Sequence, residues 1–317
     1  MLGKAAGFLD RAFFRPDSLH PDLVFGLALA APVLAGLVLF RVAALELLLI
    51  AVLTGGAVQL AATMLRLRLE TSPILLGVMG VALCGPLSAP IWPILVAAGA
   101  ALLEVLRSNL WPRARINTGV LAYAAAFIAG RGAMAAYQRP GSSLIFPEPI
   151  AQWSLFYGGA AHFIEPITLY VGNVAGPVFA TSLLAVAIGM AWLWYARRLS
   201  LIAAAAFLAA GLAMSLALHW DPVFQLGGGP TWFVVGLALC DRRQMPEQPL
   251  ARPVMAVAAA VVGIGLRASG YYIEALFLAV AAIESVYAVV ELIARLLAQR
   301  LGISQPPALA GTESLSV

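Results

Sequence analysis

The sequence predicts an all-α membrane protein with about ten transmembrane helices, arranged as two inverted five-helix repeats that contain short broken helices. Of its 317 residues, 62% are apolar and only 11% are charged, whereas soluble domains carry about 25% charged residues. The apolar residues form blocks of roughly 15 to 25 residues between charged ones, as hydrocarbon-spanning helices require. The Lys and Arg residues are also distributed unevenly between successive connections, as in multi-pass membrane proteins.

The apolar blocks predict each span in turn. Four basic residues, Arg41, Arg131, Arg139 and Arg267, fall outside if the N-terminus is cytoplasmic, and the other fifteen of the nineteen fall inside. Adding or removing one span would destroy this bias, so the number of spans and the orientation support each other. The predicted spans lie near residues 22–40, 42–63, 73–88, 91–106, 117–130, 173–195, 200–218, 231–241, 253–267 and 272–293.

These spans divide the chain into five parts. We expect a cytoplasmic N-terminal segment at 1–21, a first five-helix repeat at 22–130, an outside loop at 131–172, a second repeat at 173–300 and a flexible cytoplasmic tail at 301–317. Residues 1–21 contain no apolar core followed by a cleavage site, so we expect no removed signal peptide. The predicted location is the bacterial inner (cytoplasmic) membrane, with both termini in the cytoplasm.

An internal repeat supports the inverted arrangement. Gly80–Cys84 reads G-V-A-L-C and Gly236–Cys240 reads G-L-A-L-C. The third span thus matches the eighth, and an offset of five spans turns the second copy upside down. Prolines interrupt both regions, and interrupted helices expose backbone groups and dipole ends to a ligand. The alternative is that both are ordinary helices whose ends are placed imprecisely.

Several classes of function find no support in the sequence. The basic residues are scattered in small groups and form no stripe, which argues against nucleic acid as a partner. His20, His162 and His219 show no metal-binding spacing, and Walker loops and hydrolase motifs are lacking. Cys84 and Cys240 are too few for an iron–sulfur cluster in one chain, and small apolar packing explains them better.

The order of several motifs resembles the RnfD/NqrB family of membrane flavoprotein subunits. In the first half, Glu70–Gly77, Pro90-Ile91-Trp92 and Asn117-Thr118-Gly119 are similar to the family's S-A-L-L-T-G, A-P-W-W and F-N-P-A segments. In the second half, Gly172–Ser182 is similar to its G-x-x-G-S-x-G-E-T-S segment, and Gly270–Ala279 to its G-G-Y-P-x-G-x-A-F-A segment. The resemblance covers nearly the whole chain, with degenerate motifs that suggest a divergent branch, such as the UnbU-like proteins.

The resemblance implies a subunit of an ion-translocating, flavin-containing electron-transport complex. Family members carry FMN on a threonine in an S-G-A-T-P-like motif, but the corresponding stretch here, Pro140–Glu148, contains no threonine. Covalent FMN is therefore not expected. A flavin, FMN or riboflavin, that is held non-covalently stays compatible with the sequence. The lipid bilayer and other membrane subunits are the expected partners.

Polar residues near the breaks are the candidate flavin ligands, because a flavin needs hydrogen-bonding groups around its ring edge and an apolar slot for its rings. Asn117 is the strongest candidate, although capping of the fifth span explains it equally well. Asp241 has the alternative of a plain loop ion pair. The predicted cofactor-binding residues are Ser72, Asn109, Asn117, Thr118, Asp241 and Arg252.

Carboxylates inside the last span are the candidate ion path, because a charged group in the membrane is costly. Glu284 and Glu291 lie seven residues apart and hence on one helix face, with Glu274 near the outer end of the span. The alternative for Glu291 is a structural pair with Arg295 one turn further on.

Three hypotheses of function follow. The first is an RnfD-like subunit of transmembrane electron transport, coupled to ion movement; if it is an enzyme, it is a subunit of a redox-driven, ion-translocating oxidoreductase. The second is a solute or ion transporter or channel on the same scaffold without redox chemistry, since fold does not fix function. The third is a non-redox structural subunit of a membrane complex.

Overall fold

The computed structural model describes residues 16–156, 165–246 and 248–300, and this part of the chain is helical, with isolated β-bridges in place of strands. Five of its helices are long and apolar enough to cross a membrane: Pro21–Phe40, Val42–Met64, Ile91–Leu110, Ala251–Tyr271 and Glu274–Leu297. The prediction of an all-α membrane protein is confirmed. The predicted tail at 301–317 and most of the N-terminal segment 1–21 lie outside the described residues.

The first half of the chain forms five consecutive helices after a short 3-10 turn, η1 (Pro16–Ser18). They are α2 (Pro21–Phe40), α3 (Val42–Met64), α4 (Pro73–Val81), α5 (Ile91–Leu110) and α6 (Thr118–Ala129). Arg41 separates α2 from α3 with a positive φ of 50°, which ends the first helix and turns the chain back. Proline at the first helical position begins α2 and α4, where its missing N–H costs nothing.

A further set of helices forms the second half. It comprises α9 (Leu183–Tyr195), α10 (Leu201–Ala217), α11 (Pro222–Leu226), α12 (Gly229–Val234) running into the π-helix η2 (Val235–Leu239), α13 (Ala251–Leu266) running into the π-helix η3 (Arg267–Tyr271), and α14 (Glu274–Arg300). Arg197 turns the chain between α9 and α10 with a φ of 57°.

The helix α4 in the first half and the helix α12 in the second half are short. α4 has nine residues and spans about 14 Å, roughly half of a 30 Å hydrocarbon layer. It ends at Val81, so the predicted span 73–88 is wrong at its end, where Gly85 and Pro86 stop the helix. The broken end is covered by other segments: Gly85 N–H donates to the Met134 carbonyl oxygen at 2.8 Å, and Val178 N–H donates to that of Cys84 at 2.9 Å.

The connection between the halves is longer than predicted. It contains α7 (Pro149–Phe156) and α8 (Pro166–Val171), and α9 begins at Leu183, so the predicted start of the sixth span at 173 is wrong. Residues between α8 and α9 are apolar and buried, among them Val178, Phe179 and Ala180. They are buried as irregular chain, which explains why hydropathy alone assigned them to a span.

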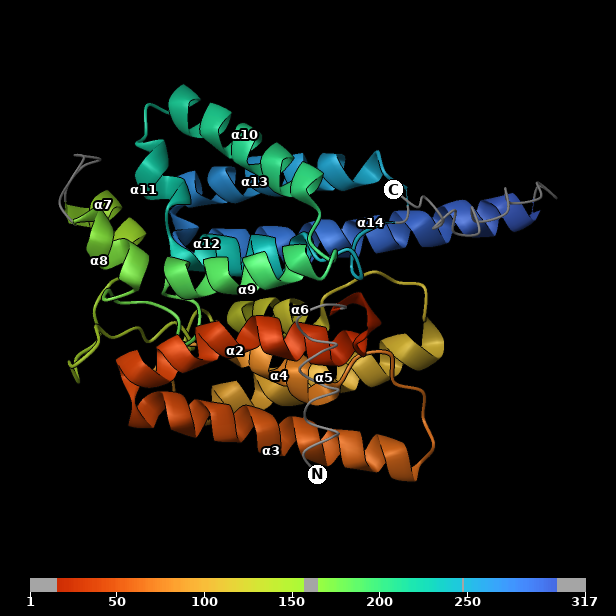
Figure 1. Cartoon of the computed structure of the whole chain (residues 1–317). Helices are drawn as coiled ribbons and strands as arrows, with labels where there is room; N and C mark the ends of the chain where they lie inside the picture. Colours follow the sequence, from red (N-terminus) through yellow and green to blue (C-terminus); the bar gives the residue numbers. More distant parts are fainter. Residues whose placement is uncertain (1–15, 157–164, 247, 301–317) are drawn as a thin grey trace.

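Figure 1 shows the two groups of helices as separate halves, with α2–α6 in red to yellow below and α9–α14 in green to blue above. The halves meet where α2 packs on α9 and where α6 packs on α14. Contact between α2 and α9 is close because Gly189 has no side chain. A Cβ atom there would lie 2.4 Å from the Ala28 carbonyl oxygen.

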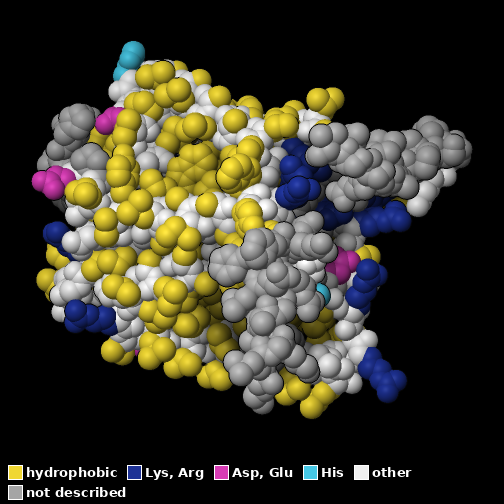
Figure 2. All heavy atoms as spheres, in the orientation of Figure 1, with side chains coloured by type: hydrophobic (Ala, Val, Ile, Leu, Met, Phe, Trp, Pro, Cys, Tyr) yellow, Lys and Arg dark blue, Asp and Glu magenta, His cyan; other side chains and the backbone are white. Residues whose placement is uncertain are grey.

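Charged side chains gather at the two ends of this bundle and apolar ones lie between them, as Figure 2 shows on one face. The end opposite α7 and α8 is called the arginine-rich end, because the loops after α3, α5, α9 and η2 lie there. Arg115 from one of these loops donates to the Arg243 carbonyl oxygen of another at 2.7 Å. The basic residues of these loops are Arg66, Arg68, Arg113, Arg115, Arg197, Arg198, Arg242 and Arg243.

Candidate functional site

The contact between α6 and α14 brings two predicted site residues together. Asn117 precedes α6, and its backbone N–H donates to Glu284 Oε2 on α14 at 2.7 Å. The Asn117 side chain caps α6, with Oδ1 accepting from the N–H groups of Gly119 and Val120 at 3.0 and 3.1 Å. Capping holds the N–H of Asn117 in place, so the carboxyl group receives a fixed donor.

Close packing of α6 against α4 positions this cap. A Cβ on Gly119 would lie 2.5 Å from the Leu76 carbonyl oxygen, and a Cβ on Gly80 would lie 2.8 Å from that of Gly119. Only glycines allow the two backbones to approach so closely. The start of α6 is therefore fixed by α4, the short helix of the first half.

Three polar atoms at this contact between α6 and α14, here called the seam, are buried and lack a hydrogen-bond partner: Glu284 Oε1, Asn117 Nδ2 and Thr118 Oγ1. The exposed fraction of each of these three residues is 2% or less. Tyr123 packs edge-on against Phe277 with ring centroids 5.5 Å apart, so its hydroxyl lies nearer the start of α14, beside Tyr137 and Glu274. Buried polar groups normally have partners, so this concentration marks a site that can accept one.

Glu291, the second residue of the predicted ion path, is not in this seam. It is partly exposed and forms an ion pair with Arg295 on the next turn of α14. This is the structural alternative that its spacing allowed. Whether it takes part in ion movement stays a prediction.

A cavity of about 390 Å³ opens beside the seam at the arginine-rich end. Ile116, one residue before Asn117, and Leu76 of α4 contribute to its lining. Polar lining comes from Arg68, Glu70, Thr71, Glu104, Arg107, Arg115, Arg243 and Gln244. We call this cavity the arginine vestibule.

Two of the predicted cofactor ligands lie at the edge of the vestibule and use their side chains for structure. Ser72 Oγ donates to Gln59 Oε1 at 2.8 Å, and Ser72 N–H donates to Asp22 Oδ2 at 3.1 Å. Asn109 holds the backbone of Arg68 through both its amide oxygen and its amide nitrogen. Both side chains fasten the loop between α3 and α4.

Asp241 and Arg252 lie elsewhere, Asp241 in the loop after η2 and Arg252 in the first turn of α13. Asp241 is buried and binds Arg198 through two hydrogen bonds of 3.2 and 2.5 Å. Burial raises the pKa of Asp241 above its ordinary value, and the Arg198 guanidinium opposes that rise. Arg252 Nε donates to the Pro246 carbonyl oxygen at 2.9 Å. The six predicted cofactor ligands therefore do not surround one common slot.

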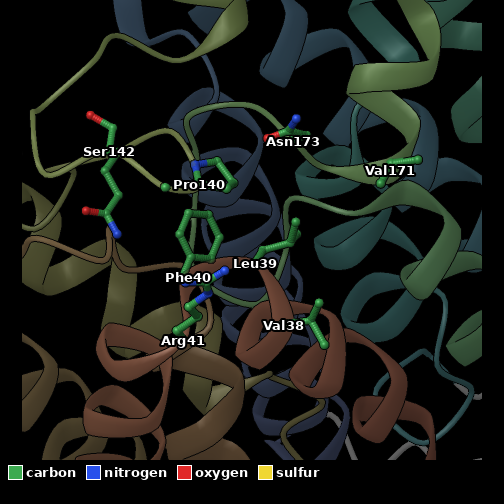
Figure 3. A pocket seen from close by; sticks show the side chains of 10 residues that line it. Val38, Leu39, Phe40, Arg41, Pro140, Ser142, Val171 and Asn173 are labelled. Carbon is green, nitrogen blue, oxygen red and sulfur yellow. The ribbon is translucent and has the colours of Figure 1, made fainter.

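A second cavity, of about 510 Å³, lies at the α7–α8 end between the turn after α2 and the segments around residues 140 and 173. Figure 3 shows Phe40 and Arg41 on one side of it, with Pro140 and Asn173 opposite. Gln138 and Ser142 complete its polar lining. We call it the outer pocket, and Pro140, Gly141 and Ser142 contribute to its lining.

Sequence reasoning missed Glu148, a buried carboxyl group at the same end. Glu148 accepts from the N–H groups of Ile150, Ala151 and Ile273, and Glu274 accepts from the Tyr137 hydroxyl at 2.8 Å. Arg267 is buried nearby and donates to Gln225 and Thr231. Glu148 stands between two prolines, and a carboxylate just before a helix-starting proline was the available signal for a cap.

Comparison with known proteins places the chain in one family. A search among curated proteins finds no match to the chain. A family model does match, over residues 22–299, which includes both halves and the seam between α6 and α14. The chain belongs to the NQR2, RnfD, RnfE family.

Proposed function

We propose that this chain is a multi-pass membrane subunit of an ion-translocating electron-transport complex, and that its ion path passes Glu284. Membership of the NQR2, RnfD, RnfE family supports the complex and the electron transport. The observation that supports an ion path at Glu284 is the packing between α6 and α14. The seam holds a buried carboxyl oxygen without a partner where the two halves of the protein meet.

We further propose that the halves are inverted five-helix repeats, α2–α6 and α9–α14, with the five-residue α11 counted as part of the connection before α12. Arg107 near the end of α5 donates to Glu70, just before α4, at 3.0 Å. Arg267 at the end of α13 donates to the Gln225 carbonyl oxygen, just before α12, at 2.6 Å. The same contact thus recurs at opposite ends of the bundle, as two upside-down copies require.

The turns add a second correspondence. After the second helix of the first half, Arg66 has a φ of 54°, and after that of the second half, His219 has a φ of 57°. In each, the N–H of the next residue bonds a carbonyl five residues back, from Leu67 to Ala62 and from Trp220 to Ser215. Both helices end with the same cap.

The six flavin ligands expected from the sequence do not line one common cavity. We therefore propose the outer pocket as the site of a non-covalently bound flavin. The residues present suit a flavin: Arg41 offers a cation, Gln138 and Asn173 offer amide groups, and Phe40 offers a ring face. A flavin bound there would supply one- and two-electron transfer. The protein's own contribution is to hold and orient its ring and to limit water around it.

Flavin binding is tested by the visible absorption of the purified chain. We expect a flavin spectrum from the wild type and its loss in Arg41→Gln. Arg139→Gln is the matched control, because Arg139 is exposed and does not line the pocket. A colourless wild-type protein that moves a solute in liposomes would instead favour a transporter without redox chemistry.

The ion path is tested in inverted membrane vesicles from a deletion strain complemented with the wild type or a variant. We expect Glu284→Gln to lower ion uptake driven by electron transfer by about 10²-fold, the loss typical of a missing proton-transfer or charge-bearing group. Glu46→Gln, which changes an exposed carboxylate on α3, is the control and should retain uptake. Equal uptake by Glu284→Gln and the wild type would contradict the proposed path.

A further inference from the structure

The chemistry of the seam indicates which ion it takes. We propose that the ion taken up at Glu284 is a proton and not a metal cation. This inference rests on the proposed function, because it assumes that Glu284 lies on the ion path. It is argued from the number of oxygen ligands, the fit of the neutral acid and the charge of the vestibule.

Oxygen ligands are too few for a metal cation. A hard cation that leaves water needs several oxygens to replace its hydration shell, six to eight for calcium, for example. In the described seam, the buried side-chain oxygens without a partner are Glu284 Oε1 and Thr118 Oγ1. Asn117 Oδ1 is occupied by two backbone N–H groups, so it is not available. The described residues also contain no cluster of three or more metal-binding side chains.

Hydrogen-bond donors face the carboxyl group where a metal site would have acceptors. Glu284 Oε2 already receives the backbone N–H of Asn117, and the unpaired Asn117 Nδ2 brings two more N–H groups to the seam. Donors repel a cation but suit a carbonyl oxygen. A neutral acid fits this arrangement, with Oε2 as the accepting carbonyl and Oε1 carrying the proton.

The surroundings of Glu284 also favour the neutral form. A buried carboxylate needs a charge partner or several hydrogen bonds, and the ion pairs of the described residues do not include Glu284. Among the packed elements, α6, α12 and η2 contain no charged side chain, and the Tyr123 hydroxyl of α6 lies beside Tyr137 and Glu274. The nearest charges on α13 and α14 are Arg252 and the Glu291 pair, both toward the arginine-rich end, and Glu274, about 15 Å along the helix at the other end.

The positive charge of the arginine vestibule also favours a proton over a metal cation. A hydrated metal cation would pass Arg68, Arg107, Arg115 and Arg243, with only Glu70 and Glu104 to offset them. A proton moves between hydrogen-bonded waters, so no cation has to carry its shell through the cavity. In the loading step, hydronium gives one proton to the Glu284 carboxylate, forming the acid and water, and release reverses it. No electron is exchanged.

Infrared spectroscopy of the purified full chain in lipid nanodiscs tests this proposal. The band to follow is the carbonyl stretch of a protonated buried acid, assigned by its loss in Glu284→Gln and its retention in Glu291→Gln. Where the first variant does not fold, Glu284→Asp assigns the band by shifting it. We expect the pH midpoint of the band to be the same in sodium chloride and in choline chloride.

Three outcomes would overturn the proton assignment. A sodium ion that competes for the site would lower the apparent proton affinity by about tenfold for each tenfold rise in sodium beyond its dissociation constant. Absence of the Glu284 band at every pH would show that the group stays ionised, and a band that does not change with pH would show that the group never releases its proton. These failures differ from that of the proposed function, which is decided by the vesicle uptake of Glu284→Gln and not by the sodium dependence of the band.

Discussion

Glu148 is a buried carboxyl group that ties the start of α7 to the chain just before α14. Burial raises its pKa from 4.5 to about 7, and the three N–H groups that it accepts oppose this rise. The folded protein therefore binds more protons than the unfolded chain between these two values. Its contribution to the free energy of unfolding is present at low pH and falls as pH rises through this window.

The variant Glu148→Gln should remove this dependence. We expect the wild type to lose on the order of 3 kcal/mol from this group between pH 4.5 and 7. The check is the slope of thermal unfolding temperature against pH in detergent. Glu165→Gln, at an exposed position, should keep the wild-type slope, and a Glu148→Gln slope equal to it would refute the assignment.

The Arg198–Asp241 pair joins three segments, since Arg198 also donates to the Pro21 carbonyl oxygen at 2.6 Å. Asp241→Ala leaves the Arg198 guanidinium, whose side chain is only 14% exposed, without its partner. We expect a loss of about 3–5 kcal/mol in denaturant unfolding, as for other broken buried pairs. Glu291→Ala breaks a more exposed pair and should cost about 1 kcal/mol or less. Similar losses in both variants would contradict the distinction.

At the scale of elements, the contact of α6 with α4 depends on Gly119. Gly119→Ala places a methyl group 2.5 Å from a backbone oxygen that cannot move away, and we expect it to cost about 1–3 kcal/mol. Gly99→Ala in α5 meets only ordinary contacts, the nearest at 3.5 Å, and should gain up to about 1 kcal/mol from helix propensity. Thermal unfolding of the two variants checks this, and a stabilised Gly119→Ala would show that α4 and α6 are further apart.

Helices bounded by charges or prolines could be predicted from sequence. Arg41 and Pro73 mark the ends of α2 and the start of α4 as expected. Hydropathy placed the start of the sixth span too early, before α9, because Val178 and Phe179 are apolar and buried without being helical. The site was predicted only in part: Asn117 and Glu284 were both named, but they are 167 residues apart, and no local pattern pairs residues at that separation.

At the scale of the whole molecule, the two halves form one body with basic loops gathered mainly at one end (Figure 2). From the positive-inside rule we propose that this end faces the cytoplasm and that the outer pocket faces the other side of the membrane. The arginine vestibule, which Ile116 next to Asn117 helps to line, would then open to the cytoplasm. The orientation and the ion path are thus linked, because the vestibule must face the side from which the ion is loaded.

Cysteine labelling tests this orientation with little background, because Cys84 and Cys240 are both fully buried. Ser143→Cys introduces a thiol at an exposed position beside the outer pocket, and Arg113→Cys one in an exposed loop at the arginine-rich end. We expect a membrane-impermeant maleimide to label Ser143→Cys in intact cells, and Arg113→Cys only after permeabilisation. Labelling of both variants in intact cells would place both loops on one side, which an inverted pair of five-helix repeats does not allow. The reverse pattern would keep the repeats but turn the vestibule outward, so that the proton at Glu284 would be loaded from the opposite side.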